Sequence, residues 1–357
     1  MTVTNKKEID ISSGLQCPIP KSDYEHVLLA HGGGGTLSHQ LISKMFFPQF
    51  DNELLNEQHD SAIFNIDNSR LAFTTDSYVV QPIFFPGGDI GELAVNGTIN
   101  DLTVAGAHPL YISAGFIIEE GFAMEDLWKI VLSMKRAAND AGVNIVTGDT
   151  KVVDKGKGDK IFINTSGIGL ISKGINISPK RCVPGDKIIL SGRIADHGIA
   201  IMSAREGLEF DTTLESDTAP LNKLFEKMER FGDGIHVMRD PTRGGLASSL
   251  NEIADTANIG ILIDENKIPI SEEVKGACEI LGLDPLYIAN EGKMIAIVSE
   301  DIADELLNEI RNHSLGSEAE IIGEVTSNNP RTVIMKTSIG SNRIVDMISG
   351  EQLPRIC

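Results

Sequence analysis

Residues 172–186, SKGINISPKRCVPGD, contain two prolines, two glycines and a cluster of charges between two longer stretches of mixed pattern. Proline and glycine interrupt helices and strands, so this stretch predicts a domain boundary. A chain of 357 residues is long enough for two separate cores. We therefore expect an α/β (α+β) protein whose parts are an extended lead-in over 1–40, domains over 41–172 and 182–336, and a mobile tail over 337–357.

Each half of the chain alternates strand-like and helix-like segments. Runs rich in β-branched and aromatic residues predict strands, and apolar residues at helical spacing predict helices. In the first half we expect strands over 69–80, 110–118, 143–150 and 159–171, and helices over 88–107 and 124–140. In the second half we expect strands over 187–192, 259–264, 293–300 and near 319–336, and helices over 242–258, 271–282 and 302–313.

Composition and charge exclude several classes of function. A formal net charge of -20 repels nucleic acid, and no basic patch with interleaved aromatic residues appears. No apolar stretch is long enough to span a membrane, and no secretory signal is evident. The four cysteines form no C-x-x-C pair, which suits a reducing compartment. We expect a soluble cytoplasmic protein.

The sequence HGGGGT at 31–36 predicts a loop that could bind phosphate. Consecutive glycines (Gly32, Gly33, Gly34 and Gly35) let backbone N–H groups converge on an anion without side-chain clashes. A Walker A loop would require Gly-Lys-Ser/Thr, and no G-x-G-x-x-G fingerprint or G-x-S-x-G elbow is present. A flexible hinge remains the alternative interpretation.

Four aspartates occupy strand ends and helix mouths. Asp76 and Asp149 end predicted strands, and Asp240 precedes a turn that opens a helix. Asp101 falls on the small, apolar side of a predicted helix, where a carboxylate needs neutralisation. Such carboxylates commonly hold Mg²⁺ bound to phosphates. For each aspartate the alternative to metal binding is an N-cap or a solvated turn, and for Asp149 the two interpretations are equally supported.

Three further residues carry reactive side chains. Lys151 follows TGDT directly, and Glu291 stands beside a glycine before an apolar strand, where it could act as a base. For each of these two, an exposed or plain turn position is the stronger interpretation on the residues alone. The chain ends on Cys357, a thiol that could serve as a carrier or simply be a frayed end.

Taken together, the segments HGGGG, TTDS, NDLTVAGAHP, TGDTKV, DPTRGGLA, ANEGK and the terminal PRIC resemble the HypE family of hydrogenase maturation factors. The resemblance runs from about residue 27 to residue 357. The inner motifs alone indicate the wider group that includes aminoimidazole ribonucleotide synthetase, selenophosphate synthetase and thiamine-monophosphate kinase. The terminal PRIC narrows the resemblance to HypE.

The resemblance implies a two-domain aminoimidazole ribonucleotide synthetase-like fold, a homodimer and ATP with Mg²⁺ as cofactors. It implies that the thiol of Cys357 receives a carbamoyl group from the carbamoyltransferase HypF. ATP-dependent dehydration then gives a thiocyanate, whose cyanide passes to iron on the HypC–HypD scaffold for [NiFe] hydrogenase. By resemblance, Glu291 is the base and Lys151 assists it. The residues expected near ATP are the four glycines, Asp76, Asn100, Asp101 and Thr150, and the expected metal ligands are Asp76, Asp101, Asp149 and Asp240.

Three other functions compete with this one. A kinase or synthetase of the same group that acts on a free small molecule would have no use for Cys357. A non-catalytic, ATP-gated thiol carrier would bind nucleotide without hydrolysing it. A redox carrier would need a resolving cysteine near Cys357.

Overall fold

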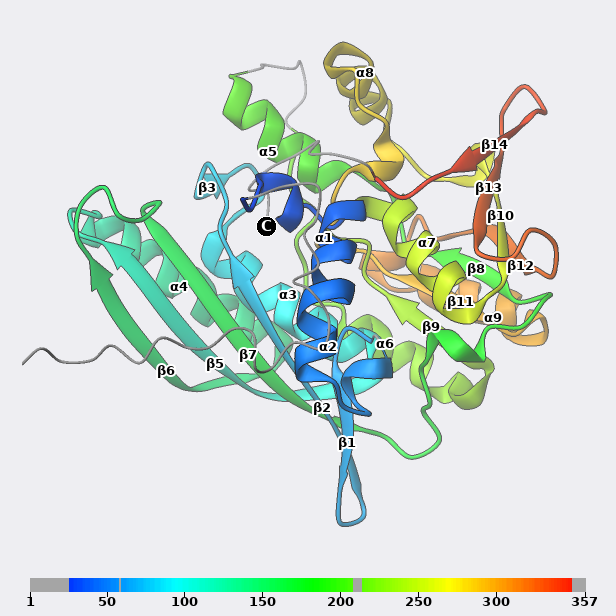
Figure 1. The fold of residues 1–357 in the computed structure, drawn as a ribbon, viewed down its shortest axis with the longest axis horizontal. Coiled ribbons are helices and arrows are strands. Elements are labelled where there is room, and N and C mark those ends of the chain that lie inside the picture. Colours follow the sequence, from blue (N-terminus) through cyan, green and yellow to red (C-terminus); the bar gives the residue numbers. More distant parts are fainter. Residues whose placement is uncertain (1–25, 58, 208–213, 349–357) are drawn as a thin grey trace, which may run out of the picture.

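The computed structural model of this protein describes residues 26–57, 59–207 and 214–348. Within these ranges the chain forms two mixed sheets, seen on the left and the right of Figure 1. The N-terminal sheet has the order β1-β2-β7-β5-β6, and the C-terminal sheet has the order β14-β13-β10-β12-β8-β11-β9. The α/β class is confirmed.

The N-terminal domain contains every element expected between residues 69 and 171. Helix α4 lies behind the sheet in Figure 1. The side chain of Asp89 caps α3 by accepting hydrogen bonds from the backbone N–H groups of Gly91 and Glu92, and Gly142 ends α4 in the left-handed region. The elements are β1 (Ala62–Ile66), β2 (Ser69–Tyr78), β3 (Phe84–Phe85), β4 (Gly88–Asp89), α3 (Ile90–Val104), β5 (Ala107–Glu119), α4 (Met124–Ala141), β6 (Asn144–Val153) and β7 (Ile161–Ile171).

Helix α3 forms the centre of the molecule. All of its residues are buried except Glu92 and Asp101, which are half-buried. A helix that is buried on nearly every side must be covered by several other elements. The N-terminal sheet and α4 cover part of α3, and its C-terminal end packs into a core shared with the second domain, where Leu102 and Val104 join Leu224 and Phe225. The two domains therefore meet along α3.

The C-terminal domain adds elements that the sequence patterns did not reveal, namely α5 (Asp196–Glu206), α6 (Asn222–Met228) and β9 (Ile235–Arg239). These segments are short or carry polar residues, so their periodicity is weak. The remaining elements agree with expectation: β8 (Lys187–Leu190), α7 (Gly245–Ala257), β10 (Gly260–Asp264), α8 (Glu272–Leu281), β11 (Ile295–Val298), α9 (Glu300–Arg311), β12 (Glu320–Thr326) and β13 (Thr332–Lys336).

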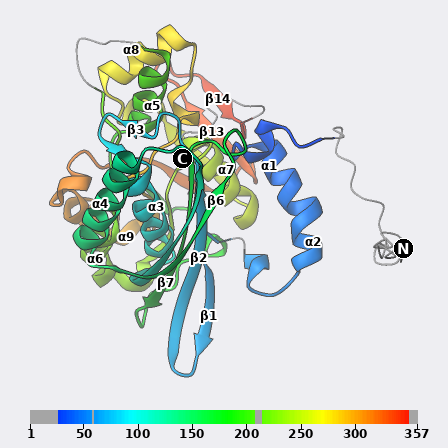
Figure 2. The ribbon, with the colours of Figure 1, turned by 90° about the vertical axis from the view of Figure 1, so that its left-hand side faces the viewer.

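Two expectations about the ends of the chain are wrong in part. Residues from Thr36 onward are helical, in α1 (Thr36–Leu41), a π-helical turn over Ile42–Phe46 and α2 (Phe47–Phe50), which stand at the side of the molecule in Figure 2. Residues assigned to the tail include β14 (Asn342–Val345), which pairs with β13. None of the helices in the described ranges is both long and apolar enough to cross a membrane.

Candidate active site between the two domains

Three of the predicted carboxylates, Asp76, Asp101 and Asp240, gather at the junction of the domains. They come from β2, α3 and the residue after β9. Burial raises the pKa of Asp101 well above its usual value, and the charges of Asp76 and Asp240 raise it further. Burial, followed by the charge of Asp60, raises the pKa of Asp240 to about 7. The carboxylates thus repel one another in a dry environment, which favours a cation or protons between them.

Hydroxyl groups orient two of these carboxylates. Thr74 Oγ1 donates to Asp101 Oδ2 at 2.7 Å, and Tyr78 Oη donates to Asp76 Oδ2 at 3.1 Å. Gly97 makes room for the phenol, because a Cβ at this position would lie 2.0 Å from Tyr78 Oη. The local sequence of β2 and α3 therefore fixes where both acids point.

Glu291 lies on the other side of the same junction and is only 2% exposed. Burial raises the pKa of its carboxyl group well above the usual value, and the charges of Asp240, Asp217 and Asp76 raise it further, whereas Arg243 lowers it. Its Oε1 atom is buried without a hydrogen-bond partner among the described residues. A carboxyl group whose pKa is raised in this way can take part in proton transfer.

The glycine run lies between a turn of the C-terminal domain and the last described residue. A Cβ at Gly34 would lie 2.8 Å from Arg243 Cβ, and a Cβ at Gly35 would lie 2.4 Å from Ile348 Cγ2. Arg243 Nη1 also donates to the carbonyl oxygen of Gly32 at 3.3 Å. Glycine is therefore required at 34 and 35 by close approach, and the loop touches the residue that leads into the C-terminal segment.

Asp149 does not join the other aspartates within one chain. It pairs in register with Gly115, and Gly115 pairs with Asn164. Asn164 pairs with Ser77, the residue after Asp76. Since neighbours in register share a face and successive residues alternate, Asp149 faces the side of the sheet opposite to Asp76, three strands away and roughly 14 Å distant.

Lys151 shares this position on the outer strand β6. Its Nζ lies 2.7 Å from Asp149 Oδ2, and the two side chains are 68% and 70% exposed. Asp149 and Thr150 line a cavity of about 660 Å³ between α4 and β6. Across residues 26–57, 59–207 and 214–348, no three His, Cys, Asp or Glu side chains are arranged to hold a metal ion. The predicted set of four ligands is therefore not assembled by a single chain, and Lys151 does not lie beside Glu291.

Comparisons with known proteins agree with this geometry. Models of the AIR synthase related protein family match residues 58–171 with the N-terminal domain and residues 183–336 with the C-terminal domain. The chain is 53% identical to carbamoyl dehydratase HypE of Cupriavidus necator, over 92% of this chain and 94% of that protein. The chain belongs to the HypE family of carbamoyl dehydratases.

Solved structures of HypE proteins have the same fold. A HypE in complex with HypF superposes with a TM-score of 0.83 at 52% identity, covering 86% of this chain and 99% of that one. A HypE in complex with ATP gives a TM-score of 0.79 at 49% identity, covering 93% and 100%. The expected family and its two-domain fold are thereby confirmed.

In this HypE-family chain Asn100 connects the two domains. Its Nδ2 donates to the carbonyl oxygens of Ala219 and Glu291, each at 3.0 Å, and its Oδ1 accepts from the backbone N–H of Leu221 at 2.8 Å. The side-chain amide, expected near the nucleotide, is thus occupied by the protein and holds α3 against the second domain.

Sequence patterns missed four charged residues of the junction: Asp60, Asp217, Lys293 and Arg243. Arg243 and Lys293 lie in the segments DPTRGGLA and ANEGK, but nothing in those segments distinguished them from surface residues. Asp217 carries no local signal, since it resembles an ordinary turn residue. The predicted thiol carrier Cys357 lies outside the described residues.

Proposed function

We propose that this chain converts a carbamoyl group on its own terminal thiol, Cys357, into a thiocyanate at the expense of ATP. The observation that carries the proposal is the carboxyl group of Glu291, which is buried and unpartnered opposite Asp76 and Asp240. A general base needs a lone pair that is not committed to another hydrogen bond, and Glu291 Oε1 has no partner among the described residues.

The overall reaction balances as S-carbamoyl plus ATP giving S-cyano plus ADP, phosphate and a proton. The carbamoyl oxygen attacks the γ-phosphorus, and the O–P bond turns a poor leaving group into phosphate. Loss of the two N–H protons and departure of phosphate then leave the C≡N triple bond. In this scheme Glu291 takes a proton from nitrogen, and Lys151 positions the group or returns a proton.

The acidic side of the junction suits a divalent cation. Burial raises the pKa of Asp76, Asp101 and Asp240, the charge of Asp76 raises the pKa of the other two further, and Asp60 Oδ2 is buried without a hydrogen-bond partner among the described residues. Mg²⁺ prefers carboxylate and phosphate oxygens, and its charge would offset the negative charges of these carboxylates and of the ATP phosphates. Because side chains of the described residues do not form a metal site by themselves, ATP phosphates would supply ligands to the ion beside Asp76, Asp101 and Asp240, and the glycine run would approach the same phosphates.

A homodimer would complete the site. The outer face of the N-terminal sheet exposes Phe73, Tyr111 and Ile117, each close to half exposed, although they lie on central strands. Uncovered apolar groups on a sheet face indicate a partner surface. A second copy on this face would bring its own Asp149 and Lys151 toward the junction of the first, which would reconcile the predicted site with the separation of these residues in one chain.

The partners proposed for the reaction are HypF as carbamoyl donor and the HypC–HypD complex as acceptor of the cyanide, in the cytoplasm. The decisive measurement is the mass of the C-terminal peptide after incubation with the carbamoyl donor, with and without ATP. We expect a carbamoyl adduct on Cys357 without ATP and loss of one water from it with ATP. Cys357→Ala should keep its fold and ATP binding but accept no carbamoyl group. Thiocyanate formation on another cysteine of this variant would refute the proposal.

A further inference from the structure

Side chains bind both backbone polar groups of Glu291, its N–H and its carbonyl oxygen. Its backbone N–H donates to Asp217 Oδ1 at 3.0 Å, and its carbonyl oxygen accepts from Asn100 Nδ2 at 3.0 Å. Asp217 lies in the loop before α6, and Asn100 lies in α3. Segments far apart in the sequence thus fix the two peptide groups that flank the Cα of Glu291.

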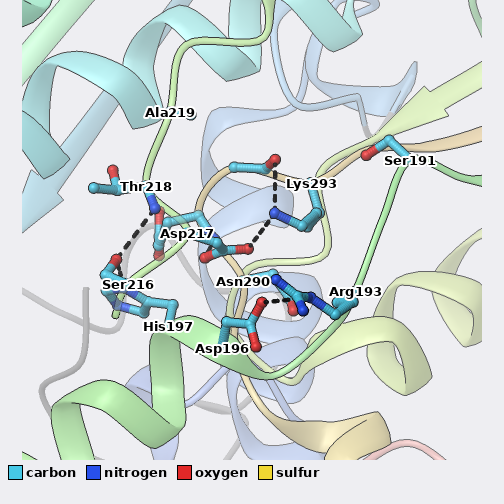
Figure 3. Close-up of polar contacts among 12 residues, drawn as sticks. Ser191, Arg193, Asp196, His197, Ser216, Asp217, Thr218, Ala219, Asn290 and Lys293 are labelled. Carbon is cyan, nitrogen blue, oxygen red and sulfur yellow. Dashed lines mark hydrogen bonds and ion pairs between the residues drawn. The ribbon is translucent and has the colours of Figure 1, made fainter. Parts of the chain in front are cut away.

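Lys293 holds Asp217 in place. Its Nζ lies 3.2 Å from Asp217 Oδ2, and the two side chains are only 12% and 4% exposed. The same Nζ donates to the carbonyl oxygen of Gly292 at 3.4 Å. Figure 3 shows the ammonium group of Lys293 pointing both at this carbonyl and at the carboxylate of Asp217. A neighbouring cation of this kind stabilises a buried carboxylate in its place.

The backbone between these residues is packed too closely for a side chain. A Cβ at Gly292 would lie 1.9 Å from the carbonyl oxygen of Asp217 and 3.0 Å from the backbone nitrogen of Ala219. The preceding residue, Asn290, donates to the carbonyl oxygen of Pro241 at 2.8 Å. Residues 290–293 therefore have little freedom while the Asp217–Lys293 pair is intact.

The side chain of Glu291 lacks an equivalent anchor, because its Oε1 accepts no hydrogen bond from the described residues. The direction of its carboxyl group is consequently set by its own peptide and by packing. A group that must meet a proton within hydrogen-bond distance loses rate when it is displaced by an ångström.

We propose that Asp217 and Lys293 are a positioning pair that aims the carboxyl group of Glu291 at the carbamoyl nitrogen. This inference rests on the proposed function, and it assigns these two residues to the elimination of protons rather than to nucleotide binding or thiol loading. Neither residue is proposed to touch the substrate.

The test is a single-turnover experiment on the full chain, loaded with a carbamoyl group at Cys357 and mixed with saturating ATP and Mg²⁺. Asp217→Asn keeps an oxygen acceptor for the Glu291 N–H but removes the carboxylate charge that pairs with Lys293. Lys293→Met leaves Asp217 uncompensated. Each variant should lose water from the C-terminal peptide about 10- to 100-fold more slowly, with an unchanged KM for ATP and unchanged loading of Cys357. Wild-type rates in both variants would overturn the inference.

A second comparison distinguishes positioning from a general loss of structure. In a Glu291→Gln background, adding Asp217→Asn should slow the reaction no further, because the pair acts through Glu291. If the rate losses of the two single variants multiply in the double variant, Asp217 has an independent role and the positioning pair is refuted. If Glu291→Gln alone dehydrated its tail at the wild-type rate, the proposed role of Glu291 as the base would be refuted, whatever the result for Asp217 and Lys293.

Arg193→Met is the matched control. Arg193 is a cation at the rim of the same cluster, paired at 3.0 Å with Glu318, and is about half exposed. Its other ion pair is with Asp196 at 3.8 Å, not with Asp217 or Glu291. This variant should dehydrate its tail at the wild-type rate, and melting temperatures of all variants exclude unfolding as the cause of any slow reaction.

Discussion

The backbone N–H of Thr36 donates to the carbonyl oxygen of Ile348 at 2.9 Å, and Thr36 Oγ1 donates to the same oxygen at 3.1 Å. Thr36 directly follows the glycine run, and Ile348 is nine positions before Cys357. The loop proposed to bind phosphate is therefore bonded to the point from which the thiol-bearing segment departs. Nine residues can span roughly 30 Å when extended.

Gly35→Ala should break this connection. The new Cβ would lie 2.4 Å from Ile348 Cγ2 and 2.5 Å from the carbonyl oxygen of Ile348, so one of the two segments must move. We expect faster hydrogen exchange at the amide of Thr36 and a dehydration rate lowered by about 10-fold or more. Gly32→Ala is the control, since a Cβ there meets nothing within 4 Å. Equal exchange rates in both variants would contradict the close approach.

Glu291→Gln should separate the steps before proton loss from the loss of protons from the carbamoyl nitrogen. The amide keeps the size of the side chain but cannot act as a base, so the rate should fall on the order of 10²–10⁴-fold. The variant should still accept a carbamoyl group on Cys357 and bind ATP, and carbamoylated tail should accumulate. The mass of the C-terminal peptide over time measures this. A tail that loses water at the wild-type rate would remove Glu291 from the mechanism.

Stability without ligand should fall as the pH rises. The pKa of Asp240 is about 7 in the folded chain against 3.8 in the unfolded chain, because burial and Asp60 disfavour its charge. Its stabilising contribution is complete below about pH 4 and is lost through about pH 7, a change on the order of 2–4 kcal/mol. Melting temperature should therefore be lower at about pH 8 than at about pH 5, and Mg²⁺ with ATP should restore it.

Asp240→Asn should flatten this pH dependence, because an amide does not titrate. Asp149→Asn provides the comparison: Asp149 is exposed, and its hydrogen bond with Lys151 lowers its pKa rather than raising it. The slope should persist in that variant. If the melting temperature of the wild-type chain instead rises from about pH 5 to about pH 8, the pKa of the junction carboxylates is not raised as described.

Mixing two inactive variants should restore activity. Glu291 and Lys151 lie apart within one chain, so a site built from both would draw Lys151 from a second copy. A dimer of one Glu291→Gln chain and one Lys151→Ala chain would then contain one intact site. Random mixing should recover about a quarter of the wild-type rate. Absence of recovery, with mixed dimers verified by mass, would assign both residues to the same chain or remove Lys151 from the site.

The amino-acid sequence determined the class of fold and most of the elements. These features depend on local periodicity and on proline and glycine, which act over a few residues. Helix α3 is an example. Asp101 lies on the small, apolar side of the predicted helix, so the sequence predicted a carboxylate that needs neutralisation. In the structure, Asp101 lies among crowded acids.

Tertiary structure alone decided which of the predicted residues meet. Asp76 and Asp149 both end strands in similar sequences, yet strand order and register put them on opposite faces of one sheet. The roles of Asp217 and Lys293 had no signal because they come from a contact between a loop and a turn 76 positions apart. Sequence periodicity describes one element at a time, whereas a site is formed by long-range packing that buries charges from several elements together.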